Sequence, residues 1–276
     1  MTDVTVQPFP VAALAALFDD GLPAPGPGDP LPPYWQLAAC AAPPPTGLLG
    51  PDGHPREGLV SAPPGLPRRM FAGGRLRLPG TVLVGDRLVR SAEVTAETGK
   101  EGRSGRLRFV TVTARLARPD GEVVLSEEQD IVYRAGAPAP AGAPRPAPPA
   151  PGPGPLLSRN GQPLQARFRA DPVALQRFSA ATSNPHRIHY DHPYVTGVEG
   201  YPGLVVHGPL LLLAMLELVR LDLPGRAVAA VAFSARAPVF AAEQVMLAGQ
   251  QDGDVVRLTA RNPAGTTAMT CDVTLR

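Results

Sequence analysis

Histidine is concentrated in one stretch of this 276-residue chain: three of its five histidines are His186, His189 and His192, and a fourth is His207. Histidine changes charge near neutral pH, so such a cluster favours proton transfer or metal binding. Gly208 follows the fourth histidine and precedes an apolar run, where a helix would begin with unpaired N–H groups. Such groups can bind a developing oxyanion. The residues therefore predict an enzyme that moves a proton beside a carbonyl group.

A metal site built from His186, His189 and His192 is the rival interpretation, and their spacing argues against it. Zinc-binding histidine pairs on a helix are four residues apart, whereas these are three and six apart. His192 also precedes Pro193 in a stretch that reads as a loop. We therefore expect no metal and no separate cofactor.

The elements that must hold these residues are clearest in the C-terminal half. Asp171-Pro172 predicts a helix that begins there and continues through Ser179, since Asp caps a helix and Pro suits its first turn. Residues 209–221 predict a helix that is apolar nearly all round and hence buried. Strands are expected over residues 228–240, 244–250 and 255–275, the last with a turn at 262–265. A buried helix followed by long antiparallel strands is an α+β plan, the hot-dog arrangement.

The N-terminal half predicts the same plan less clearly. Expected there are a helix over residues 11–19, a Pro-rich region through 67, and strands over 81–96, 106–118 and 122–134, separated by turns at 99–105 and 119–121. Residues 135–160 are rich in Ala, Pro and Gly and predict a linker. We expect a tandem double hot-dog, residues 1–134 and 161–276, with continuous sheets and chemistry only in the C-terminal half.

Composition narrows the class of protein. The chain is 44% hydrophobic and 18% charged, as expected of a soluble globular protein. Its net charge of +2 is too small to favour nucleic acid. The longest apolar run, residues 209–221, contains Glu217 and Arg220 and is too short to span a bilayer. We expect a cytoplasmic homodimer without a membrane partner.

The histidine segment and the later Val206-His207-Gly208 resemble the MaoC-like, R-specific enoyl-CoA hydratase superfamily of hot-dog proteins. That superfamily carries Asp-x-Asn-Pro-x-His and then Val-His-Gly, and Pro238-Val239-Phe240 matches its next strand. The match puts His189 on the family histidine. Three positions depart: Asn184, His186 and Arg187 stand where the family has Asp, Asn and Pro.

These departures are similar to those of the mesaconyl-C4-CoA (3-methylfumaryl-CoA) and itaconyl-CoA hydratases. Supporting motifs are Pro67-Arg-Arg-Met-Phe-Ala-Gly-Gly74, Lys100-x-Gly-Arg-Ser-Gly105 and Glu128-Gln-Asp-Ile-Val-Tyr-Arg134. The resemblance implies a hydro-lyase that adds water to a short branched dicarboxylic enoyl-CoA, with CoA as part of the substrate. Two alternatives stay open: a 3-hydroxyacyl-thioester dehydratase of fatty-acid metabolism, and a non-catalytic acyl-CoA-binding subunit.

The resemblance also implies roles for single residues. Hydration needs a base, an acid and donors for an enolate-like oxygen, and His189 is the candidate base and the Gly208 N–H the candidate donor. Asn184 can orient water but cannot act as a base. His186 or Asp191 could replace the missing carboxylate, although Asp191 is also placed to cap a helix or pair with Arg187.

Other residues are candidates for holding the substrate. A free substrate carboxylate favours an arginine fork, for which Arg187, Arg68 and Arg69 are candidates. We also assign His207 and Tyr190 to substrate binding. The basic residues in or beside the Gly-rich turn are expected to bind the phosphates of CoA, and these are Lys100, Arg103 and Arg106.

Overall fold

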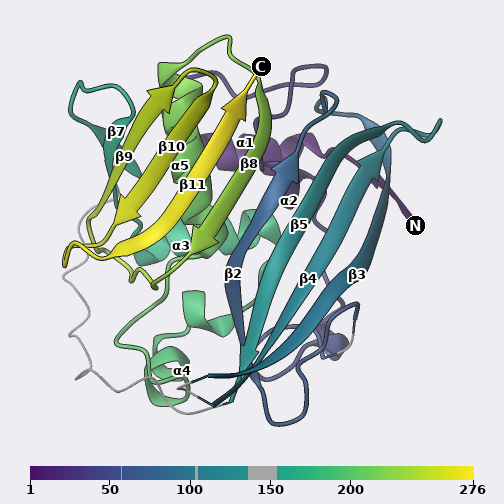
Figure 1. Cartoon of the computed structure of the whole chain (residues 1–276), viewed down its shortest axis with the longest axis vertical. Coiled ribbons are helices and arrows are strands. Elements are labelled where there is room, and N and C mark those ends of the chain that lie inside the picture. Colours follow the sequence, from purple (N-terminus) through teal and green to yellow (C-terminus); the bar gives the residue numbers. More distant parts are fainter. Residues whose placement is uncertain (57, 103–104, 136–153) are drawn as a thin grey trace.

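The computed structural model describes residues 1–56, 58–102, 105–135 and 154–276. Within these ranges eleven strands form one antiparallel sheet in the order β1-β3-β4-β5-β2-β8-β11-β10-β9-β7-β6 (Figure 1). The N-terminal strands are β1 Thr2–Thr5, β2 Arg68–Arg77, β3 Arg87–Gly102, β4 Gly105–Ala117 and β5 Val123–Arg134. The C-terminal strands are β6 Leu157–Arg159, β7 Gln165–Phe168, β8 Val228–Ala235, β9 Val245–Asp252, β10 Val255–Arg261 and β11 Thr267–Leu275.

The helices are α1 Pro8–Phe18, α2 Gln36–Ala39, α3 Pro172–Thr182, α4 His192–Gly197 and α5 Gly208–Asp222, with 3-10 turns η1 Thr46–Leu48 and η2 Arg187–His189. Helices α1, α3 and α5 lie behind the strands in Figure 1, on one face of this sheet, and α4 lies low in that view, beyond the ends of the C-terminal strands. Helix α5 packs against β7, β10 and β11, and every side chain from Leu210 to Val219 is buried. None of the helices in the described ranges is both long and apolar enough to cross a lipid bilayer.

The two halves join through β2 and β8, which pair from Gly73↔Ser234 to Arg77↔Ala230. This pairing confirms the predicted continuous sheet, although β2 itself was not predicted as a strand. Two adjacent glycines make this segment a weak candidate for a strand in the sequence. The structure shows why glycine is needed there. A Cβ on Gly74 would lie 2.9 Å from the Phe233 ring and 2.3 Å from the Glu128 carbonyl oxygen.

The predicted elements occur in the predicted order with shifted ends, and the turn predicted at residues 99–105 is shorter because β3 continues to Gly102. Strands β1, β6 and β7 and helices α2 and α4 were not predicted. Asp171 caps α3 by accepting a hydrogen bond from the Ala174 N–H at 2.8 Å. The predicted linker, residues 135–160, lies mostly outside the described residues, and its last part contains β6. The two halves differ in their helices. Helix α2, which follows Trp35 in the N-terminal half, is only four residues long, whereas α5 in the C-terminal half has fifteen residues. Helix α1 packs against α2 and α3.

Candidate active site

Four histidines from the two halves form one row of contacting rings. His54, from the N-terminal half, lies with its ring centroid 4.0 Å from that of His186. His186 meets His189 edge-on at 5.4 Å, and His189 stacks on His207 at 3.6 Å. We call these four residues the histidine row. It brings together three residues that the sequence analysis named and one that it did not.

Backbone and hydroxyl groups hold the inner rings of the row. His189 Nδ1 lies 2.8 Å from the Val205 carbonyl oxygen, which can only accept a hydrogen bond. His189 therefore carries its proton on Nδ1 and a lone pair on Nε2. His207 Nε2 lies 2.9 Å from Ser179 Oγ, while its Nδ1 is buried with no partner among the described residues.

Burial keeps the inner histidines neutral. It lowers the pKa of His189 to about 4, an effect that the Val205 carbonyl opposes and His54 strengthens. Burial, with the neighbouring imidazoles, lowers the pKa of His186 and His207 far below the ordinary value. None of these three rings is suited to carry a positive charge at neutral pH.

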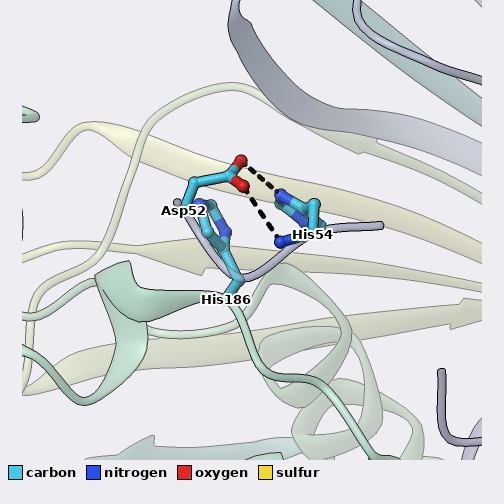
Figure 2. Close-up of side chains that lie close together, drawn as sticks. All are labelled: Asp52, His54 and His186. Carbon is cyan, nitrogen blue, oxygen red and sulfur yellow. Dashed lines mark hydrogen bonds and ion pairs between the residues drawn. The ribbon is translucent and has the colours of Figure 1, made fainter. Parts of the chain in front are cut away.

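The outer end of the row is different, because His54 meets a carboxylate (Figure 2). Asp52 accepts two hydrogen bonds from His54, one from ring Nδ1 and one from the backbone N–H, both at 3.0 Å. Burial alone would raise the pKa of the Asp52 carboxyl, but these hydrogen bonds outweigh it, so the pKa lies below its ordinary value. Asp52 is therefore ionised at neutral pH.

Residues 50–56, which we call the Asp52 loop, dock onto the backbone around His186. The Arg187 N–H donates to the Asp52 carbonyl oxygen at 2.8 Å, and its guanidinium donates to the Pro51 carbonyl oxygen at 2.9 Å. Gly53 has φ +93°, and a Cβ there would lie 2.0 Å from the Pro185 carbonyl oxygen. A glycine is needed at this point both for its conformation and for the close approach.

A pocket of about 960 Å³ opens beside this loop. Asp52, His54, Arg69 and Tyr133 line it, whereas His186 and His189 are not among its lining residues. Arg69 Nη1 lies 3.3 Å from His54 Nε2. Because a guanidinium can only donate, His54 has its proton on Nδ1 and its lone pair on Nε2.

The structure separates the other predicted arginines from the histidine row. The side chain of Arg187 is occupied by Asp191 Oδ2, at 2.9 and 2.7 Å, and by the ring of Tyr194. Asp191 also caps α4 by accepting from the Tyr194 N–H at 3.1 Å. Arg68 lines the pocket but pairs with Glu199. Of the three arginines predicted to bind a carboxylate, Arg69 is the one in contact with the row.

Asn184, Tyr190 and Gly208 have local structural roles. Asn184 Oδ1 accepts a hydrogen bond from the His186 N–H at 3.1 Å, so it fixes the start of the histidine segment. Tyr190 is half exposed and donates to the Pro185 carbonyl oxygen at 3.0 Å. Gly208 begins α5, and a Cβ there would lie 2.5 Å from the Phe71 ring.

The residues predicted to bind CoA lie away from the row. Lys100 and Arg106 are exposed on the β3–β4 hairpin, and Lys100 Nζ lies 5.3 Å from the Phe109 ring centroid. Lys100 shares a cross-strand row with Arg68, through Leu107 and Arg134. Three strand spacings separate them, about 14 Å. Arg103 lies outside the described residues.

A cation could be shared by Asp52, His54 and His186, whose ligand atoms all lie within 4.8 Å of one another. Two contacts favour direct hydrogen bonding instead. His54 Nδ1 and Asp52 Oδ2 already bond each other at 3.0 Å. The guanidinium of Arg69, 3.3 Å from His54 Nε2, would repel a bound cation.

Comparison with known proteins identifies the family. The family of hydroxyacyl-thioester dehydratases type 2 matches residues 35–241, which is more than half of the chain. The chain belongs to this family. It is 40% identical over 264 residues to mesaconyl-C(4)-CoA hydratase of Chloroflexus aurantiacus, which covers 95% of this chain and 90% of that protein. Membership confirms the expected superfamily and the expected hydro-lyase class.

Solved structures confirm the fold of the family member. HtdX of Mycobacterium tuberculosis matches with a TM-score of 0.64 at 20% identity, covering 99% of this chain and 97% of that chain. A second M. tuberculosis protein, described as a double hotdog fold, matches with a TM-score of 0.54 at 16% identity, covering 99% and 93%. The predicted double hot-dog is therefore confirmed.

The sequence analysis missed Asp52 and His54. Both lie in the Pro- and Gly-rich part of the N-terminal half, which reads as an unstructured connection. One signal was available: His54 is the fifth histidine, and Asp52 stands two residues before it across a glycine. Nothing in the sequence indicates that this loop reaches His186, because the contact joins the two halves of the chain.

Proposed function

We propose that the chain adds water to the double bond of a short branched dicarboxylic enoyl-CoA, mesaconyl-C4-CoA or itaconyl-CoA, giving citramalyl-CoA. The 40% identity to a mesaconyl-C(4)-CoA hydratase over 95% of the chain supports the reaction. The observation that carries the choice of a dicarboxylic substrate is Arg69, which lines the pocket beside His54. A substrate carboxylate in a partly enclosed pocket needs such a partner.

We assign two inner groups to the reacting atoms. His189 Nε2 has a free lone pair and can hold water as an acceptor, but with its pKa lowered to about 4 by burial it is a weak base. The Gly208 N–H, at the first turn of α5, is the candidate donor to the thioester oxygen. Homodimer assembly, a cytoplasmic location and CoA binding by Lys100 and Arg106 belong to the same proposal.

A side-by-side assay tests the substrate. The purified chain is given mesaconyl-C4-CoA, itaconyl-CoA and crotonyl-CoA, with loss of enoyl-thioester absorbance followed and products identified by mass spectrometry. We expect the highest kcat/KM with one of the two dicarboxylic thioesters. Preference for crotonyl-CoA would favour the fatty-acyl dehydratase alternative, and binding without turnover would favour a non-catalytic subunit.

A further inference from the structure

We infer that His54, oriented by Asp52, is the catalytic acid and base, so that a loop of the N-terminal half completes the hydration site. The inference rests on the proposed function and names the group that moves the proton. It replaces the expectation that the C-terminal half alone carries the chemistry.

The chain needs such a group because the segment around Asn184 lacks a carboxylate. An amide cannot take up a proton as a carboxylate does. If His189 took the proton, a positive charge would be buried among imidazoles and a backbone carbonyl. His186 lies within 4.8 Å of the Asp52 carboxylate, but its ring does not line the pocket. His54 Nδ1 instead donates to the ionised Asp52 carboxylate at 3.0 Å, so a proton taken up by His54 has a negative charge in direct contact with the ring.

The geometry of His54 suits a base that faces substrate. Its Nδ1–H is held by Asp52, so the lone pair on Nε2 is fixed in direction. The ring lines the pocket, with 19% of the side chain exposed, and Arg69 lies at the same nitrogen. A substrate carboxylate that attracts the Arg69 guanidinium would free Nε2 for water, which couples binding of the dicarboxylic acid to release of the base.

In the proposed step, His54 both accepts a proton from water and returns that proton to the substrate. With mesaconyl-C4-CoA, whose double bond is conjugated with the thioester, His54 Nε2 takes one proton of water while the water oxygen bonds to the β-carbon and the π electrons of the double bond move toward the thioester carbonyl. The enolate that forms is then protonated at the α-carbon by the same imidazolium. His54 returns to its neutral tautomer, and the substrate has gained one water molecule.

Replacement of His54 tests the inference. His54→Gln keeps a polar side chain but cannot carry the proton, and we expect kcat/KM to fall by about 10²-fold or more. His192→Gln, a histidine outside the row, is the matched control and should stay within about twofold of wild type. Thermal unfolding and circular dichroism check that both variants fold.

Chemical rescue separates catalysis from structure. His54→Ala leaves a gap at the pocket wall, and added imidazole should restore part of the lost kcat in proportion to its free-base concentration. Asp52→Asn, which changes only the positioning residue, should lower kcat with KM nearly unchanged. The matched control is Asp254→Asn, whose carboxylate pairs with Arg226 at the surface.

Each remaining outcome overturns the inference. His54→Gln within a few-fold of wild type removes His54 from the reaction, and loss of activity without imidazole rescue shows a structural role. A metal found by elemental analysis of the active protein, and lost in His54→Gln, would make these side chains ligands instead. A wild-type chain inactive on all three thioesters would overturn the proposed function together with the inference.

Discussion

The Asp52 loop and the segment from Asn184 to Asp191 meet at His186 but differ in chemistry. The Asp52 loop brings an ionised carboxylate and a histidine to the pocket wall. The second segment brings His186 and His189, which burial holds neutral. The comparison shows how histidine can serve in two ways. His54, the ring proposed to change charge, lies beside the Asp52 carboxylate at the pocket wall, while the neutral rings of His186 and His189 form the interior of the site.

The largest test of this comparison is to separate the two segments. Gly53→Ala puts a Cβ within 2.0 Å of the Pro185 carbonyl oxygen, so the Asp52 loop must move away from His186. We expect kcat/KM to fall about as far as in His54→Gln, ~10²-fold. Gly121→Ala is the matched control, because Gly121 has φ +95° and nothing within 4 Å of its Cβ position. Equal losses in both variants would show that strain alone is responsible.

Removal of an inner ring tests the neutral side. His189→Ala deletes the Nε2 lone pair and the ring that stacks on His207 at 3.6 Å. We expect kcat/KM to fall by roughly 10²-fold with the fold retained, measured by steady-state assay and circular dichroism. Turnover within a few-fold of wild type would remove His189 from the mechanism.

Stability against pH sharpens the same point. Unfolded histidine titrates near its ordinary pKa, about 6.5, whereas burial holds the pKa of folded His189 at about 4. The unfolded chain therefore binds more protons in this window, and stability is lost as pH falls through it. The loss from His189 alone should reach about 3 kcal/mol at pH 4. Urea unfolding between pH 7 and 4 measures it, and His189→Gln should flatten the curve.

At the pocket wall beside His54, Arg69 should discriminate between substrates with and without a free carboxylate. Arg69→Met removes the guanidinium that lines the pocket, so kcat/KM with a dicarboxylic thioester should fall about 10- to 100-fold more than with crotonyl-CoA. Arg115→Met, which removes a surface arginine paired with Glu93, is the control. Equal losses on both substrates would place the carboxylate elsewhere.

The smallest effect is expected for Asn184→Asp, which puts a carboxylate at the position where the resembling superfamily has its aspartate. Asn184→Asp can still accept the hydrogen bond from the His186 N–H, so its local structure should persist. If proton transfer belongs to His54, this variant should keep part activity, within about tenfold of wild type. Activity above wild type in the steady-state assay would instead make the chain a decayed form of the Asp-containing hydratases.

Local signals predicted the elements of the C-terminal half well. The Asp171 cap, the apolar helix α5 and the turn at residues 262–265 all follow from neighbours in sequence. Strand β2 was missed because the reason for its glycines is Phe233, which belongs to the other half. The Asp52–His54 pair was missed for the same reason, since its meaning depends on a contact with Pro185 and His186. Sequence patterns reflect interactions between residues that are close along the chain, whereas this site depends on contacts between residues of the two halves.

Strand β2 pairs with β8 within one polypeptide, so the Asp52 loop and the histidine segment always occur in a one-to-one ratio. Separate hot-dog subunits could also associate like with like, and such pairs would hold two loops or two histidine segments and no complete site. A covalent connection makes the correct encounter intramolecular, at an effective concentration that dilution does not change. Because of this seam, the encounter of the two segments in the proposed site does not depend on the concentration of the protein.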